Sequence, residues 1–153
     1  MITLRLATQE DFDILKKMCI LFLEESPYRS YPRELHKIEA LIGSFLVGDL
    51  SKTCVLAIYK DKPIGMIAGN ISETLFSHHL VASEVVWWID PDHRRKSKAA
   101  LELLGAFEYW ARINKASYVQ MQCLSGLNED GVGRIYKRLG YNQNEIAYVK
   151  ELI

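Results

Sequence analysis

The chain has 153 residues, the size of one ordinary domain, which can bury about two thirds of the surface that its unfolded form exposes. Its 19 Lys and Arg residues balance 19 Asp and Glu residues, so no overall field draws the molecule onto nucleic acid or an anionic membrane. Any binding site for an anion must therefore be local.

The lack of targeting signals and the pattern of cysteines indicate where the protein is located. The apolar run that includes residues 19–23 is six residues long and no run is longer, far short of the roughly 20 residues that span a bilayer, and the first residues lack the basic and apolar regions of a secretion signal. We therefore expect a cytoplasmic protein. The three cysteines, Cys19, Cys54 and Cys123, are odd in number and form no CxxC pair, which favours free, buried thiols over a disulfide framework.

The N-terminal part of the chain predicts one strand and two helices. Residues 2–6 alternate apolar and polar side chains, as in a strand with one buried face. Residues 8–11 resemble a capping box with Asp in place of Glu, so Thr8 is expected to open a helix that ends near residues 26–27. A second amphipathic helix is expected from Leu35 to the region of Gly48.

The middle of the chain predicts a hairpin, a further strand and the longest helix. Residues 53–59 and 64–71 are rich in β-formers, and the Lys-Asp-Lys-Pro between them favours a tight reversal. Residues 83–89 form the next predicted strand, which ends at Asp-Pro-Asp because proline cannot donate to a strand ladder. Apolar residues then recur at helical spacing over residues 97–114.

The C-terminal part predicts a strand at residues 117–124, a short helix at residues 130–139 and a last strand at residues 147–152, with a further short strand near Tyr141. No internal repeat or linker divides the chain, so residues 1–153 are expected to form a single domain. The order of elements predicts an α/β (α+β) fold with a mixed, mostly antiparallel central sheet of six to seven strands and about four helices on both faces.

The turn before the longest helix is the most informative segment. Residues 94–99 lead into a helix N-terminus, where unpaired amides and the positive end of the helix dipole suit a phosphate. Arg94, Arg95, Lys96 and Lys98 add four positive charges. A basic loop before a helix is also common on a solvated surface, but its position after a buried strand favours a ligand site.

The same turn resembles a known family motif. The segment Arg-Arg-Lys-Ser-Lys-Ala at residues 94–99 is similar to the [Q/R]-x-x-G-x-[G/A] pyrophosphate loop of the GNAT (Gcn5-related N-acetyltransferase) family. Residues 134–141, RIYKRLGY, are similar to the family's LYxKxGF segment, and residues 59–66, YKDKPIGM, to its "dgkpvG" hairpin. The run that starts at Trp87, WWIDPDHRRKSKAALELL, also resembles short GNAT proteins carried by bacteriophages.

One residue departs from the family pattern. Ser97 stands where the family usually has glycine, and its Cβ could crowd a diphosphate that glycine lets approach closely. The serine hydroxyl could instead donate a hydrogen bond to a phosphate oxygen. The loop is therefore either a modified phosphate loop or a degenerate one.

The resemblance implies a GNAT fold, acetyl-CoA (coenzyme A) as co-substrate and no metal. It also implies that the pantetheine chain is hydrogen-bonded to backbone near residues 88–90, in a gap between the strands at 83–89 and 117–124. The implied partner is a small-molecule or protein amine acceptor, and a homodimer is possible by analogy; neither a membrane nor nucleic acid is an expected partner. The cofactor-binding residues implied in this way are Trp88, Ile89, Asp90, Arg94, Arg95, Lys96, Ser97, Lys98 and Ala99.

Two catalytic residues follow from the resemblance. Glu84 is the predicted general base, because an ammonium group with a pKa of about 10.4 must lose a proton before its nitrogen can attack a thioester. Tyr136 is the predicted general acid, which would protonate the departing thiolate. The competing interpretations are that Glu84 is a charge at the strand entrance facing solvent and that Tyr136 is a half-buried tyrosine packed on the sheet.

The sequence thus predicts an acyltransferase that moves an acetyl group from acetyl-CoA to a primary amine by direct attack in a ternary complex. The alternative is a non-catalytic acyl-CoA-binding or regulatory module. A nucleic-acid-binding protein that uses the basic turn at residues 94–98 is the least favoured hypothesis, because the net charge is zero.

Overall fold

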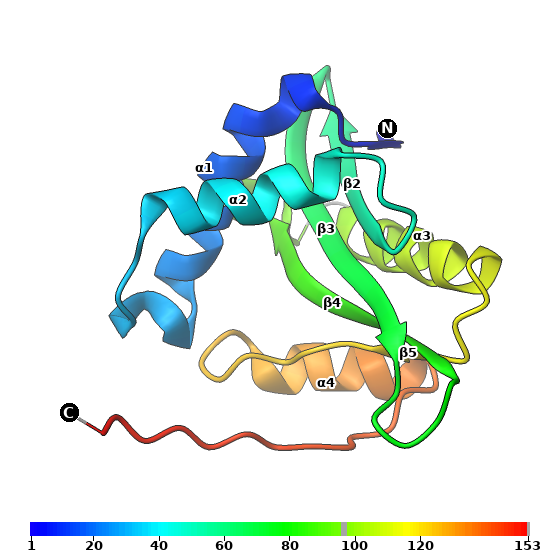
Figure 1. Cartoon of the computed structure of the whole chain (residues 1–153). Helices are drawn as coiled ribbons and strands as arrows, with labels where there is room; N and C mark the ends of the chain where they lie inside the picture. The colour runs from blue at the N-terminus through cyan, green and yellow to red at the C-terminus, as the bar shows by residue number, and fades with distance from the viewer. Residues whose placement is uncertain (96–97, 153) are drawn as a thin grey trace. The chain divides into compact units, whose positions relative to one another are not determined.

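The computed structural model describes residues 1–95 and 98–152 of the chain. Within them the elements follow the predicted order up to the last helix (Figure 1). The strands are β1 (Ile2–Leu6), β2 (Lys52–Tyr59), β3 (Lys62–Glu73), β4 (Leu80–Ile89) and β5 (Tyr118–Gln120). The α-helices are α1 (Phe12–Glu25), α2 (Leu35–Leu46), α3 (Ala99–Ile113) and α4 (Glu129–Arg138).

The described strands form one sheet in the order β1-β2-β3-β4-β5. The first three pairings are antiparallel and the pairing of β4 with β5 is parallel. A mixed, mostly antiparallel sheet is therefore confirmed. The parallel step requires a crossover, which α3 supplies between β4 and β5.

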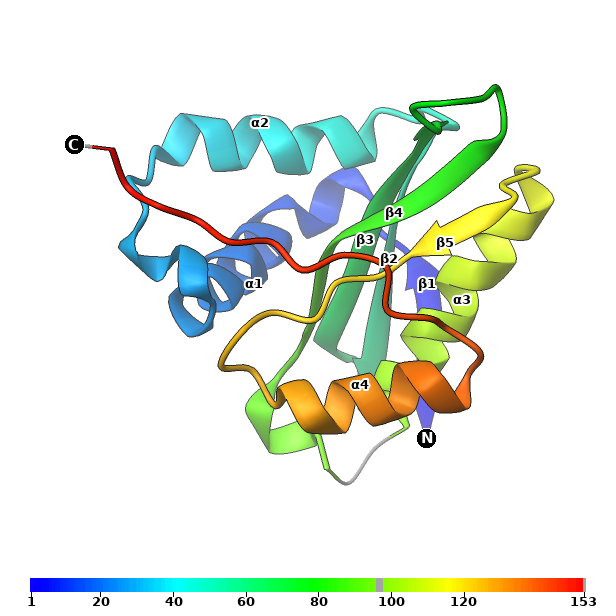
Figure 2. The same ribbon diagram turned by 90° about the horizontal axis from the view of Figure 1, so that it is seen from below.

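Helices cover both faces of this sheet, as predicted. Helix α3 lies on one face, while α1 and α2 lie on the other (Figures 1 and 2). The core on the α3 side includes Leu103 and Phe107, which are fully buried against strand residues such as Ile67. On the other side Leu15 and Met18 of α1 are buried. Each helix presents one apolar stripe to the sheet, and burial of that stripe gives most of its stability.

The predicted capping box at Thr8 is present, but it opens a short 3-10 helix, Gln9–Asp11, and α1 begins after it at Phe12. Thr8 is extended, and its backbone N–H donates to Asp11 Oδ2 at 2.8 Å, which is the reciprocal bond of a capping box. Arg5 donates to both oxygens of the same carboxylate, at 2.7 and 2.8 Å. This guanidinium holds the pKa of Asp11 at about 2, well below its usual range.

The chain divides into two compact units, residues Met1–Gln122 and Cys123–Ile153. The first unit contains the sheet with α1, α2 and α3. The second contains α4, which ends at Arg138 and is followed by Gly140 in the left-handed region, with a φ of 89°. There the ring of Tyr136 lies 5.4 Å from that of Tyr141, centroid to centroid.

The prediction of six to seven strands is wrong for the described residues, which form five. Residues 141–152 contain no strand, and β5 is three residues long where eight were predicted. Tyr148 and Val149 of the expected last strand are 91% and 75% exposed. Alternating polarity shows that a segment suits a half-buried strand, but it does not show that a partner edge exists to receive it.

The cysteine prediction holds in two of three positions. Cys19 and Cys54 are buried thiols, whereas Cys123 is exposed. Burial raises the pKa of Cys54 to about 12, which leaves it an unreactive packing residue. No helix in the part of the chain that the structure describes has the length and apolar character needed to cross a membrane.

Candidate active site

The sheet opens along one edge of β4. Strand β5 pairs with β4 only from Val81 to Ser83, where Ser83 faces Gln120. Beyond that point β4 continues to Ile89, and among the described residues its backbone pairs only with β3 on the other side. From Glu84 to Ile89, therefore, no described strand pairs with β4 on its β5 side, and such an edge can accept an extended ligand through backbone hydrogen bonds.

A β-bulge in β4 sets the direction of the Glu84 side chain. Ala68 faces Val86 and Gly69 faces Glu84, so Val85 is an extra residue with no partner in β3. Cross-strand partners point to the same face, and neighbours along β3 point to opposite faces. Glu84 therefore points to the α3 side of the sheet, and Val86, two residues on, points to the other side.

Glu84 is buried, with 6% of its surface exposed. The backbone N–H of Gln122 lies 3.4 Å from its Oε2 and donates to it. Burial raises the pKa of Glu84 to about 7, and the hydrogen bond from Gln122 opposes this only in part. The solvent-facing interpretation of Glu84 is therefore wrong, and a carboxyl group that titrates near neutral pH is suited to accept a proton.

The residue opposite Glu84 has to be glycine. A Cβ at Gly69 would lie 2.6 Å from the ring of Phe107 and would collide with the Ser83 carbonyl oxygen. We expect Gly69→Ala to destabilise the fold by about 1–3 kcal/mol, because neither the backbone nor this fully buried ring can move aside cheaply. Urea unfolding followed by circular dichroism measures the change.

Gly105 in α3 is the matched control, because nothing lies within 4 Å of its missing Cβ. Gly105→Ala should be neutral or stabilise the protein by up to about 1 kcal/mol through helix propensity. Equal stability of the two variants would contradict the close packing between β3, β4 and α3 at Gly69.

The first cation of the basic turn makes a set of internal contacts. Arg94 Nε donates to the carbonyl oxygen of Ile89 at 2.7 Å, and an Nη atom of Arg94 lies 2.6 Å from Glu25 Oε2. The guanidinium carbon is 5.9 Å from the centre of the Trp88 ring, whose Nε1–H donates to Glu25 Oε1 at 3.3 Å. Sequence reasoning placed Trp88, Ile89 and Arg94 in one site, and the structure adds the contacts by which Glu25 joins Trp88 to Arg94.

The other predicted cofactor residues lie around the same turn. Asp90 caps the short 3-10 helix Pro91–His93, and its own N–H donates to the Ile64 carbonyl at 2.7 Å, so this amide is already used by the sheet. Arg95 and Lys98 are exposed, and the Lys98 side chain makes no capping bond to α3. Lys96 and Ser97 lie outside the described residues.

Helix α3 starts at Ala99, which is fully buried. The first turn of any α-helix carries amides with no partner inside the helix, and α3 is long enough for its dipole to favour an anion there. The predicted helix N-terminus next to the basic turn is thus confirmed, with α3 spanning Ala99–Ile113 where residues 97–114 were predicted.

Tyr136 lies in the second unit, in α4. Its side chain is buried, and its carbonyl oxygen accepts a 2.9 Å hydrogen bond from the Tyr141 N–H. Within the described residues no group of three or more His, Cys, Asp or Glu side chains is placed to hold a metal ion.

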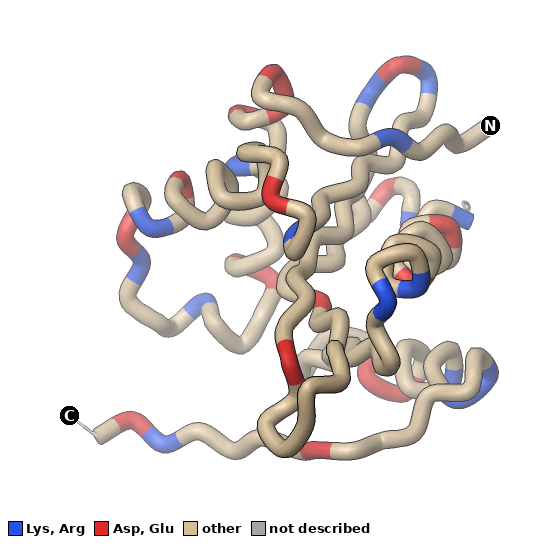
Figure 3. The backbone as a smooth tube through the Cα atoms, turned by 45° about the vertical axis from the view of Figure 1, so that its right-hand side comes forward, with Lys and Arg blue, Asp and Glu red and all other residues tan. Residues whose placement is uncertain are grey.

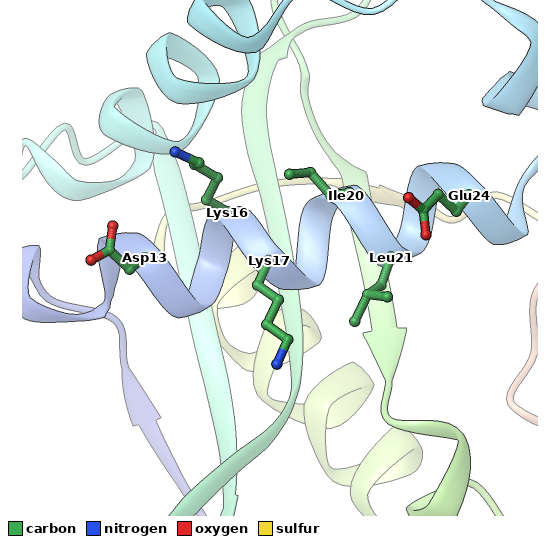
Figure 4. Close-up of a pocket in the computed structure, with 6 residues that line it drawn as sticks. All are labelled: Asp13, Lys16, Lys17, Ile20, Leu21 and Glu24. Atoms are coloured by element: carbon green, nitrogen blue, oxygen red, sulfur yellow. The ribbon is translucent and has the colours of Figure 1, made fainter.

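A shallow hollow on the surface lies elsewhere. Its walls all come from one side of α1 (Figure 4), and its lining residues are Asp13, Lys16, Lys17, Ile20, Leu21 and Glu24. None of them is among the predicted catalytic or cofactor-binding residues, and both acidic and basic side chains lie along this helix face, which is typical of a solvated surface. The hollow is therefore not part of the candidate site.

Together, the order of elements, the opening of the sheet at Glu84 and the helix that follows the basic turn agree with the acyltransferase fold that the sequence resemblance implied. The model of the GNAT acetyltransferase family matches residues 15–141, so the chain belongs to that family. The resemblance seen in the sequence motifs is thereby confirmed. No curated protein matches the chain at the level of sequence.

Solved structures share this fold at low sequence identity. The aminoglycoside acetyltransferase AAC(6')-Iy, in complex with a bisubstrate analogue of coenzyme A and acetylneamine, has a TM-score of 0.77 at 11% identity, over 100% of this chain and 99% of that one. An aminoglycoside acetyltransferase from an uncultured soil metagenomic sample, in complex with sisomicin, has a TM-score of 0.73 at 12% identity, over 99% and 96% of the two chains. A ribosomal-protein-alanine N-acetyltransferase from Brucella melitensis has a TM-score of 0.72 at 14% identity, over 99% of each chain.

Proposed function

We propose that this protein transfers an acetyl group from acetyl-CoA to a primary amine by direct attack in a ternary complex. The observation that carries the proposal is the buried carboxyl of Glu84, with its pKa near 7, at the point where β4 loses its partner strand. The family match spans both compact units of the chain, which supports their acting together as one acetyltransferase domain.

The described residues fit acetyl-CoA, which supplies an acetyl thioester. The free edge of β4 near Trp88 and Ile89 would bind an extended pantetheine chain, and the bond from Arg94 to the Ile89 carbonyl shows that this oxygen faces away from the sheet. Arg94, Arg95 and Lys98, with the first amides of α3, would hold the diphosphate. We extend this assignment to Lys96, Ser97 and Ala99 from the motif alone.

Glu84 acts as the general base in this proposal. It takes a proton from the acceptor ammonium, directly or through a water molecule, so that the nitrogen lone pair can form the new bond to the acetyl carbon. Tyr136 gives its phenolic proton to the sulfur as the carbon–sulfur bond breaks. As the carbon–sulfur bond breaks, the nitrogen loses a second proton, which restores the Tyr136 phenol through solvent. Glu84 later releases its proton to solvent, so the overall reaction gives the amide, free coenzyme A thiol and one proton. No acyl group is attached to the protein, so the buried cysteines need no role.

The similar solved structures support two classes of acceptor amine. Two of them are aminoglycoside acetyltransferases and one is a ribosomal-protein-alanine N-acetyltransferase, so small-molecule and protein amines are both candidates. In Figure 3 acidic and basic positions are interspersed along the backbone, which does not favour a nucleic acid partner.

Calorimetry with coenzyme A, followed by a thiol-release assay with acetyl-CoA and a panel of amines, tests the proposal. The panel should include polyamines, aminoglycosides and N-terminal peptides, with mass spectrometry of the products. We expect micromolar binding, on the order of −8 kcal/mol, and acetylation of at least one amine. Binding without turnover on any amine would favour the non-catalytic acyl-CoA-binding module instead.

A further inference from the structure

Three groups around the Arg94 guanidinium form a site for a cation. They are the Glu25 carboxylate, the Ile89 carbonyl oxygen and the face of the Trp88 indole. A negative charge, a backbone acceptor and an aromatic face are the groups that bind ammonium and guanidinium ligands in proteins. In this structure the cation is supplied by the protein itself.

Two of these groups are held in place by contacts that do not involve Arg94. Glu25 accepts a hydrogen bond from Trp88 Nε1 at 3.3 Å, and Ile89 is fixed by its pairing with Gly65 in β3. A Cβ at Gly65 would lie 2.8 Å from the Trp88 carbonyl oxygen, so β3 and β4 are closely packed at this point. The site would therefore keep its form if the Arg94 side chain moved away.

Arg94 has a second potential partner close by in sequence. It is the first residue of the basic turn that leads into α3 at Ala99, and it is one of the cations assigned to the diphosphate in the proposed function. Its side chain is 39% exposed, so it can turn toward solvent or a bound ligand without unpacking the core. A diphosphate carries more negative charge than one carboxylate and competes well for this guanidinium.

We propose that the Glu25 carboxylate and the Trp88 indole form the binding site for the cationic group of the amine acceptor, and that Arg94 occupies this site until coenzyme A draws it away and leaves the Ile89 carbonyl to the pantetheine chain. This inference rests on the proposed function. It makes Glu25 a specificity residue for positively charged amines, and it predicts that the coenzyme binds before the acceptor. By linkage, an acceptor cation in the site would in turn strengthen coenzyme binding.

The neighbouring glutamate provides a matched control. Glu24 is one residue earlier on α1, its side chain is 56% exposed, and it pairs with Arg33 at 3.7 Å. It has the same charge and lies at nearly the same distance along the chain from the turn, but among the described residues its ion-pair partner is Arg33, whereas Glu25 is the glutamate that binds Trp88 and Arg94.

Calorimetric titration with coenzyme A is the first test. Glu25→Gln frees Arg94, so this variant should bind coenzyme A about two- to fivefold more tightly than the wild type, the range for a partly exposed ion pair. Glu24→Gln should bind as the wild type does. Equal affinity of Glu25→Gln and the wild type would overturn the competition for Arg94 while leaving the proposed function intact.

Titration with spermidine, as a cationic probe, is the second test. Wild-type protein should bind spermidine about two- to fivefold more tightly when it is saturated with coenzyme A, and Glu25→Gln should lose this gain. Arg94→Met should bind spermidine to the same degree with or without coenzyme A. If Arg94→Met binds spermidine no better than the coenzyme-free wild type, the cation site is refuted.

The spermidine test separates the two proposals. If wild-type protein binds no coenzyme A, the proposed function fails, whereas the comparison of Arg94→Met with wild type still decides on the cation site. The indole N–H signal of Trp88 in a 1H–15N spectrum, identified by its loss in Trp88→Phe, shows that each variant is folded. That signal should shift when Arg94 is replaced, because its hydrogen-bond acceptor Glu25 loses an ion pair.

Discussion

Replacing Glu84 by glutamine is expected to lower kcat by about 10²- to 10⁴-fold, the range for loss of a general base. Glutamine keeps the size of the side chain and can still accept the hydrogen bond from Gln122, but it cannot accept a proton. Steady-state acetylation of the best amine at pH 8 measures the effect. Glu73→Gln is the control, since Glu73 lies at the far end of β3 and its side chain is 58% exposed.

The pH profile gives an independent reading of the same residue. Because the pKa of Glu84 is raised to about 7, wild-type kcat should rise with pH through this value as the carboxyl group loses its proton. The Glu84→Gln variant should lack this step. A wild-type profile that is flat between pH 5 and pH 8 at saturating acceptor would exclude Glu84 as the base.

Stability should change in the opposite direction to activity. The pKa of Glu84 rises from 4.5 to about 7 on folding, so the folded state binds more protons than the unfolded chain between these values. This group therefore lowers the free energy of unfolding as pH rises from 4.5 to 7, by up to about 3 kcal/mol. Glu84→Gln should be more stable than wild type in urea at pH 8, and the difference should shrink at pH 5.

Replacing Tyr136 by phenylalanine is expected to lower kcat by about 10²-fold while the affinity for acetyl-CoA stays nearly the same. Phenylalanine retains the buried ring and its contact with Tyr141, and it removes only the phenolic proton. Turnover and calorimetry together separate the two quantities.

Tyr148→Phe is the control for this substitution, because Tyr148 is 91% exposed and has no assigned role. It should behave as wild type. An unchanged rate in Tyr136→Phe would remove this residue from the mechanism and would favour its interpretation as a packing tyrosine.

The internal contacts of Arg94 affect the interpretation of a measured affinity for coenzyme A. The guanidinium has three partners in the first unit, so a weak affinity for coenzyme A would not by itself show that the phosphate loop is degenerate. The Glu25→Gln variant distinguishes the two causes. This variant should restore the affinity for coenzyme A if Glu25 keeps Arg94 from the diphosphate. The affinity should stay low if the turn itself cannot hold a diphosphate.

Signals that are local in sequence predicted most of the fold. Spacing of apolar residues located α1, α2 and α3 within a few residues, because a helix buries one stripe that its own sequence defines. The hairpin of β2 and β3 was predicted from the turn composition, and Lys60 and Asp61 adopt positive φ there, at 48° and 61°. The basic turn after β4 was recognised for the same reason, since strand, turn and helix start are consecutive.

The tertiary structure decided what depends on distant partners. Simple alternation along β4 puts Glu84 and Val86 on one face, and only the pairing with β3 reveals the bulge at Val85 that sends Glu84 to the α3 side and buries it. Glu25 and Arg94 are 69 residues apart, so the local sequence around either residue does not predict their ion pair. The strand expected at residues 147–152 fails for the same reason. A strand, a buried charge and an ion pair each need a second segment, and the sequence of one segment does not specify where that partner lies.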